Sequence, residues 1–183
     1  VMLQHSVREA SANPARTVSQ RLQFVELDEK GRTTYAGWAP HLDLEPLSAG
    51  DKELIKDVIE AEWVDESLEA AALKYAADKI VPDHYEEIRD RRLRQTDKVL
   101  AAVNERLVKE INHWSSRYIK LQADVAAGKQ PRMQPENAKR RAEELTARLE
   151  QRKKELSQQK HVVSATPVVL GAALVIPQGL LAT

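Results

Sequence analysis

The sequence predicts an α+β fold, in which a small β-sheet is formed by N- and C-terminal strands, with helices and a long antiparallel coiled-coil hairpin inserted between them. Three observations predict this fold. Strand-forming residues flank a glycine turn near the start, a helix-period apolar pattern runs without proline or glycine between residues 83 and 127, and a β-branched run lies near the end. The 183 residues are enough to bury a core in one domain or in two small ones.

Residues 1–19 are predicted to be a linker or disordered, because they lack a sustained apolar period and contain several turn-forming residues. A β-hairpin is predicted over residues 21–38, with its turn at Asp28-Glu29-Lys30-Gly31, where glycine can take a positive φ. We assign residues 20–48 and 161–183 to the small β-sheet subdomain.

A helical subdomain is predicted over residues 49–81. Ser48 is a suitable N-cap for a helix starting at Ala49 or Gly50, and apolar residues follow at helical spacing up to Trp63. A second helix is predicted from Ser67 to about Ile80, and Pro82 is expected to mark a break or a first helical turn.

Residues 82–160 are predicted to form the antiparallel helical hairpin arm. Apolar residues recur at steps of three or four, at Val99, Val103, Leu107, Ile111, Trp114, Tyr118, Leu121 and Val125. Gly128 is the expected C-cap of this helix, and Pro135 suits the first position of the next one. The return helix offers a second apolar seam at Ala138, Ala142, Leu145, Leu149 and Leu156. Two such helices joined by a short loop pack antiparallel.

The C-terminal segment is predicted to return to the sheet. Residues 162–163 and 167–177 are rich in β-branched residues, and the second range is bounded by prolines. This pattern indicates one or two strands buried on both faces. We expect them to pair with the hairpin of residues 21–38, since two strands alone are only marginally stable.

The composition excludes several kinds of site, and the charges are unevenly distributed along the chain. The chain has no cysteine, which excludes disulfides, thiolate metal sites and a cysteine nucleophile, and favours a cytoplasmic location. Lys and Arg number 28, equal to Asp and Glu, but the charges are divided along the chain. Residues 43–81 hold 11 acidic against 4 basic residues, whereas residues 82–160 hold 13 acidic against 19 basic residues.

The two ends of the sequence suggest a piece excised from a larger protein, because Val1 precedes Met2 and the chain stops just after an apolar run. That apolar run is interrupted by Pro167, Gly171 and Pro177, so each stretch is shorter than the roughly 20 residues of a spanning helix. We therefore expect no membrane partner.

Catalytic signatures are missing from the sequence. The six glycines are too dispersed to form a phosphate-binding loop, and the five histidines show no metal-ligand spacing. His84 and Glu87 are neighbours on a helix face, but no third ligand can be named. We expect no catalytic, cofactor-binding or metal-binding residue in this chain, and hence no enzymatic activity of its own.

Clustered positive charge is the main functional candidate. The candidate contacts with nucleic acid or a partner are Arg91, Arg92 and Arg94 at the base of the long helix, and Lys129, Arg132, Lys139, Arg140 and Arg141 at the distal loop. Such clusters suit a phosphate backbone, because binding releases counterions. The alternative is a solvated helix surface with Glu and Lys/Arg pairs.

Several runs of residues resemble a region beyond the motor of large bacterial Swi/Snf-type helicase-related ATPases, similar to the RapA/HepA type. These runs are Leu54–Val64, Ala76–Tyr85, Asp97–Leu107, Lys109–Trp114, Gly128–Arg132 and Pro167–Leu181. The resemblance covers about residues 20–181. None of the family's ATP-binding or DNA-motor motifs maps onto this chain.

The resemblance implies a parent protein that hydrolyses ATP with magnesium and moves on DNA, acting on transcription complexes or in phage defence. This chain is then expected to be a noncatalytic accessory region that contacts DNA, the motor lobes of the same polypeptide or a protein partner. The alternative is a structural coiled-coil module that dimerises or docks a partner through Trp114, Tyr118 and Leu121. That alternative requires these three side chains to be exposed.

Overall fold

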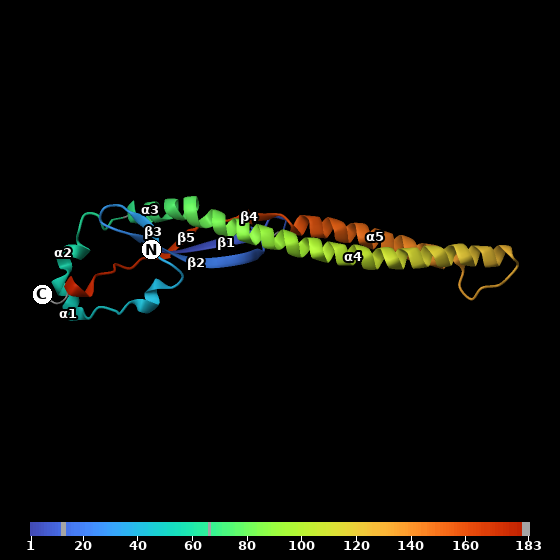
Figure 1. Cartoon of the computed structure of the whole chain (residues 1–183), viewed down its shortest axis with the longest axis horizontal. Coiled ribbons are helices and arrows are strands. Elements are labelled where there is room, and N and C mark those ends of the chain that lie inside the picture. The colour runs from blue at the N-terminus through green and yellow to red at the C-terminus, as the bar shows by residue number, and fades with distance from the viewer. Residues whose placement is uncertain (12–13, 66, 181–183) are drawn as a thin grey trace. The chain divides into compact units, whose positions relative to one another are not determined.

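The computed structural model describes residues 1–11, 14–65 and 67–180, and over these residues the predicted α+β fold is confirmed (Figure 1). The chain divides into two compact units. The sheet unit comprises Val1–Arg8, Pro14–Ile88 and Val163–Thr183, and the hairpin unit comprises Glu9–Asn13 and Arg89–Val162.

The sheet has five strands within the described residues, in the order β3-β2-β1-β4, with β5 also paired to β1. The strands are β1 (Met2–Glu9), β2 (Thr17–Leu27), β3 (Thr33–Tyr35), β4 (Val162–Ser164) and β5 (Val168–Gly171). β1 pairs antiparallel with β2, with Met2 opposite Phe24, and β2 pairs antiparallel with β3. The sheet therefore joins strands from both ends of the sequence, as predicted. The expected pairing of the C-terminal strands with residues 21–38 was wrong, because β4 and β5 pair with β1, which the sequence analysis had assigned to a linker.

The predicted β-hairpin at residues 21–38 is confirmed as β2 and β3. Gly31 adopts a φ of 73° in the turn, a conformation that glycine takes without steric cost. Asp28 organises the turn, because its Oδ1 accepts hydrogen bonds from the backbone N–H of Lys30 (3.0 Å) and of Arg32 (2.9 Å). The backbone hydrogen bond from Arg32 is the main reason that the pKa of Asp28 is lowered.

The prediction that residues 1–19 form a linker was wrong. Met2–Glu9 is the strand with the most neighbours in the sheet, and Thr17 already begins β2. The physical reason is a period-2 pattern in which Leu3, His5 and Val7 are buried on one face of β1. Because the middle position is a histidine, a count of apolar residues does not detect this alternation.

Helical residues cover the apolar part of the sheet. α3 (Ser67–Tyr75) is followed directly by a π-helical turn, η2 (Ala76–Ile80). Ala72 and Ala76 form a core cluster with Leu3 and Val25. The small alanine side chains let the helix backbone approach the strands closely. Partly buried residues packed against this cluster include Leu27, Leu73, Tyr75, Ile80 and Val169.

Pro82 does not break the helix. Helical backbone continues from Ser67 through η2 into α4 (Val81–Ala126), a stretch of 60 residues. In η2 the N–H of Val81 bonds to the carbonyl of Ala76, five residues earlier. This wider π turn precedes a residue that has no N–H to donate, so the helix accommodates the proline.

The helix predicted from Ala49 to about Trp63 is interrupted. Ser48 caps α1 (Ala49–Leu54) with a capping box to Asp51, as predicted, but a second short helix, α2 (Lys56–Ile59), follows after Ile55. Ile55 is buried, whereas Ile59 is 44 % exposed. Since Ile59 is not buried, tertiary packing does not stabilise a longer amphipathic helix at this end.

The hairpin unit consists mainly of α4 beyond Ile88 and the antiparallel α5 (Pro135–Gln159), which lie side by side in Figure 1. Leu107, Leu145 and Leu149 form its core cluster, with Val103, Ile111 and Trp114 packed against it. The seam of α5 is buried as predicted, with Ala138 at 0 % and Leu156 at 2 % exposure. Val99 and Val125, at the ends of the α4 seam, remain partly exposed.

The predicted ends of the hairpin loop are also confirmed. Gly128 adopts a φ of 76°, its N–H bonds to the carbonyl of Val125 at 2.9 Å, and the N–H of Lys129 bonds to the carbonyl of Asp124 at 3.0 Å. This pair of bonds is a Schellman motif, which satisfies the last carbonyls of α4. Pro135 occupies the first position of α5, where a missing N–H costs nothing.

The C-terminal strands are more exposed than predicted. β5 pairs antiparallel with β1, but Val168 is 58 % and Leu170 is 47 % exposed. The expectation of strands buried on both faces was therefore wrong, because antiparallel sheets commonly pack one face and leave the other in solvent. Two short 3₁₀ turns complete the fold, η1 (Pro40–Asp43) and η3 (Gln178–Leu180).

Candidate functional site

The five candidate cations at the tip of the hairpin are mostly engaged with neighbouring side chains. Lys129 forms an ion pair with Asp124 (3.0 Å), Lys139 with Glu143 (3.9 Å) and Arg141 with Glu144 (3.2 Å), and Arg140 donates to Asn137 Oδ1 (3.2 Å). Arg132 is exposed. Exposed pairs of this kind are weak, but in each one a carboxylate offsets the positive charge of its partner. Between Asp124 and Glu144, five cationic residues face four carboxylates.

The tip cations on α5 also diverge. Lys139, Arg140 and Arg141 are consecutive, so successive side chains leave the helix about 100° apart. Ala138, immediately before them, is fully buried against α4. The three cations therefore spread over the sides and the back of the helix. They do not converge on one surface, as the clustering in sequence suggested.

Arg92 has a structural position. Its Nη2 lies 3.3 Å from Glu9 Oε2, and its Nε donates to the backbone carbonyl of Gln159 at 2.9 Å. The side chains of Arg92 and Glu9 are only 22 % and 11 % exposed. Arg92 thus links α4 to the end of β1 and the end of α5 within the hairpin unit, which leaves little of its guanidinium for a partner.

Arg91 and Arg94 remain available, and the structure adds Lys98 to them. These three residues, which we call the cation stripe, are exposed and lie at steps of three and four on α4, so they share one helix face. None of them has a hydrogen bond or an ion pair within the part of the chain that the structure describes. Sequence analysis missed Lys98, although its helical spacing from Arg94 was a usable signal.

Neighbouring carboxylates do not neutralise the cation stripe because other cations hold them. Asp90 is paired with Arg89 at 3.1 Å, and Asp97 is paired with Lys160 at 2.5 Å. Three and four residues beyond Lys98 the chain has only alanines, Ala101 and Ala102. The stripe is therefore a patch of uncompensated positive charge. About 48 Å of helix separates Arg94 from the end of α4, so the stripe and the tip are distinct surfaces.

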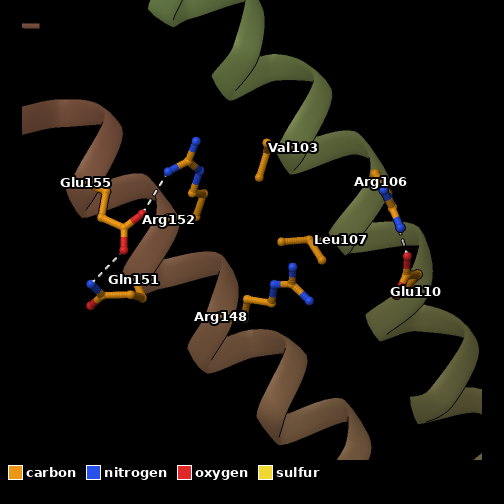
Figure 2. A pocket seen from close by; sticks show the side chains of 8 residues that line it. All are labelled: Val103, Arg106, Leu107, Glu110, Arg148, Gln151, Arg152 and Glu155. Carbon is orange, nitrogen blue, oxygen red and sulfur yellow. Dashed lines mark hydrogen bonds and ion pairs between the residues drawn. The ribbon is translucent and has the colours of Figure 1, made fainter. Parts of the chain in front are cut away.

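A groove of about 500 Å³ runs between α4 and α5 (Figure 2). In Figure 2, Val103 and Leu107 extend from α4 toward α5. The polar residues around them bond to one another: Arg106 to Glu110 at 3.2 Å, and Arg152 to Glu155 at 2.8 Å. Hydrogen bonds from Arg152 and then Gln151 lower the pKa of Glu155. The groove wall is thus an apolar seam, and its charged rim includes these two ion pairs.

A set of hydrogen-bonded polar side chains, centred on two buried histidines, lies in the sheet unit. His5 Nδ1 and His84 Nδ1 are 2.7 Å apart, His5 Nε2 is 2.9 Å from Ser164 Oγ, and His84 Nε2 is 2.9 Å from Ser19 Oγ. Both histidines are 1 % exposed. The rings meet edge to face, with centroids 4.8 Å apart. Burial lowers the pKa of His5, since an imidazolium loses its hydration there.

The four hydrogen-bonded side chains come from β1, β2, β4 and the first turns of α4. His5 and His84 are 79 residues apart in the sequence, so spacing rules gave no sign that they meet. Glu87, the neighbour of His84 on the helix, instead pairs with Arg21 of β2 at 2.8 Å. Within the described ranges, no group of three or more His, Asp or Glu side chains is placed to hold a metal ion.

Comparison of the chain with protein-family models, curated proteins and solved structures finds no match. The resemblance to Swi/Snf-type ATPases therefore stays a prediction. Among the helices in the described part of the chain, none combines the length and apolar character needed to cross a membrane.

Proposed function

We propose that this chain is a noncatalytic accessory region of a DNA-dependent ATPase of the Swi/Snf type, and that its hairpin contacts a nucleic-acid backbone through the cation stripe. The observation that carries the proposal is the presence of three exposed cations on one face of α4, with the nearest carboxylates held by other residues. In this proposal ATP and magnesium are bound by motor lobes outside these residues.

The physical argument concerns counterions. A phosphate backbone carries condensed cations, and each Lys or Arg that replaces one of them gains the entropy of its release. A cation already paired with a carboxylate must first give up that partner, so it contributes less. For this reason Arg91, Arg94 and Lys98 are better candidates than Lys129, Lys139 and Arg141, although the tip looked equally basic in the sequence.

The alternative, a dimerisation or docking module that uses Trp114, Tyr118 and Leu121, is less well supported. Trp114 packs against the cluster of Leu107, Leu145 and Leu149, and Leu121 is 7 % exposed. A second chain would have to displace α5 to reach these side chains. No observation favours that exchange over the contact already present.

The test compares two triple variants that remove the same charge. Binding of a fluorescein-labelled DNA duplex is measured by anisotropy at low and at physiological salt. Arg91→Gln/Arg94→Gln/Lys98→Gln should weaken binding at least tenfold at low salt, whereas Lys129→Gln/Lys139→Gln/Arg141→Gln should weaken it less than threefold. Equal losses in the two variants would contradict the assignment to the stripe, and unchanged binding in both would contradict a role in nucleic-acid contact.

A further inference from the structure

We propose that His5 and His84 form a proton-sensitive latch, which holds the first turns of α4 on the sheet near neutral pH and releases them in mild acid. The inference is independent of the proposed contact with nucleic acid, because it concerns only residues inside the sheet unit. It rests on four polar side chains drawn from four separate elements and joined by hydrogen bonds, with the two histidines buried at the centre.

The distance between the two rings fixes the number of protons between them. At 2.7 Å, the two Nδ1 atoms form a hydrogen bond that contains one proton. If His5 Nδ1 donates, His84 carries its own proton on Nε2 and donates to Ser19 Oγ, while His5 Nε2 accepts from Ser164 Oγ. The opposite direction is equally satisfied. With both rings neutral, every ring nitrogen of the pair therefore has a partner.

Protonation of both rings is incompatible with this arrangement. Each Nδ1 would then carry a proton, so the bond between them would be replaced by a contact of two donors and two positive charges. Neither charge can be hydrated at 1 % exposure. The second proton can bind only if the rings separate, which means that α4 moves away from β1.

Charged groups lie on both elements that hold the pair. Glu87 on α4 and Arg21 on β2, which lies opposite His5 in the strand register, neutralise each other at 2.8 Å. Asp83 on α4 and Arg8 on β1 are both exposed. The described residues of β4 and β5 within the sheet unit carry no charged side chain.

The direction of the pH dependence follows from linkage. In the unfolded chain both histidines titrate near pH 6.5 and bind two protons in acid, whereas the closed latch excludes the second of these protons. The contribution of the latch to stability is therefore fully present above that pH. It is lost as the pH falls below about 6.5, where the unfolded or opened state binds more protons. The lowered pKa of His5 agrees with this direction.

The test measures the unfolding equilibrium in urea at about pH 7.5 and about pH 5.5, on either side of the ordinary histidine pKa. In His5→Asn/His84→Asn, the two amides occupy the Nδ1 positions and can bond to each other, but they do not titrate. We expect the unfolding constant of the wild type to rise at least tenfold more between the two pH values than that of the variant. His161→Asn, which alters an exposed ring, serves as the control and should keep the wild-type pH dependence.

A second measurement keeps the proposal testable if the double variant does not fold. In the wild type, the histidine ring signals are followed by NMR, and the pair of His5 and His84 should bind its second proton only below the ordinary histidine pKa of about 6.5. Hydrogen exchange of the first turn of α4, corrected for its intrinsic pH dependence, should accelerate over the same range. Ordinary titration of both rings without faster exchange would overturn the latch. The latch would also be overturned if His5→Asn/His84→Asn were less stable than the wild type by the same amount at both pH values.

Discussion

The sheet unit and the hairpin unit are each stabilised internally by a different kind of buried contact. In the sheet unit a small apolar cluster around Leu3 and Ala72 lies beside hydrogen-bonded polar side chains centred on His5 and His84. The hairpin unit has a continuous apolar seam centred on Leu107 and Leu145, with its charged residues at the surface. The first arrangement depends on protonation and on distant parts of the chain, and the second depends only on a repeated spacing.

The largest expected effect comes from breaking the seam. Leu145 is 2 % exposed, and Leu145→Ala should lower the free energy of unfolding of the hairpin by about 2–5 kcal/mol, because it leaves a cavity between two helices. Ile119→Ala, at a position that is 64 % exposed on α4, should change stability by less than about 0.5 kcal/mol. Urea unfolding followed by circular dichroism measures both. Similar losses in the two variants would mean that α5 does not cover this seam.

The contact between helix and sheet can be tested by overpacking. Ala72 is fully buried against the strands, so Ala72→Leu should cost about 1–3 kcal/mol of unfolding free energy. Ala71→Leu is the matched control. Ala71 is the neighbour of Ala72 in the same helix but is exposed, and alanine and leucine are both good helix formers. Thermal unfolding at constant pH separates them. A tolerated leucine at position 72 would contradict the close approach of α3 to β1 and β2.

A smaller effect is expected at the hairpin loop. Gly128→Ala should cost about 1 kcal/mol, because alanine is strained at the positive φ of the Schellman motif. Gly50→Ala, where the added Cβ would lie 3.8 Å from Ser48 Oγ and the φ is not positive, should cause no loss. The comparison uses the same chemical denaturation. Equal effects at both positions would show that the loop does not need a left-handed residue.

The hairpin could be predicted from the sequence because its signals are local. Apolar steps of three and four, Gly128 at the end and Pro135 at the next start all act within one or two helical turns, and the structure confirms them. The seam also needs no other part of the chain, since its two halves are connected by a short loop. Periodicity is sufficient in such a case.

The sheet unit was only partly predictable, for the opposite reason. β1 is stabilised by partners that lie far along the chain, and its buried face includes His5, which a hydrophobicity pattern counts as polar. The exposure of Val168 and Leu170 likewise depends on which face of the sheet a helix covers. Neither property is encoded in the spacing of a few neighbouring residues.

The candidate contact surface shows the same limit. Sequence clustering favoured the tip over the base of α4, because charge alone does not reveal pairing. Only the coordinates show that Arg92 is engaged with Glu9, that the tip cations have nearby acceptors, and that Lys98 joins the unpaired face. The number of cations was predictable, but their availability was not.

The central claim is that the apolar seam is satisfied within one chain, by α5 folding back along α4. Because the chain has no cysteine, spin labels attach only to cysteines that are introduced by mutation. Dilution with unlabelled protein removes the distances between labels on different molecules. The ion pair of Asp97 with Lys160 places Lys98 near the end of α5, so labels at positions 98 and 158 should be close. A label at position 140 lies about 27 Å farther along α5 and should give a clearly longer distance from position 98. A shorter distance from 98 to 140 than from 98 to 158, or long distances for both pairs, would contradict the self-paired hairpin.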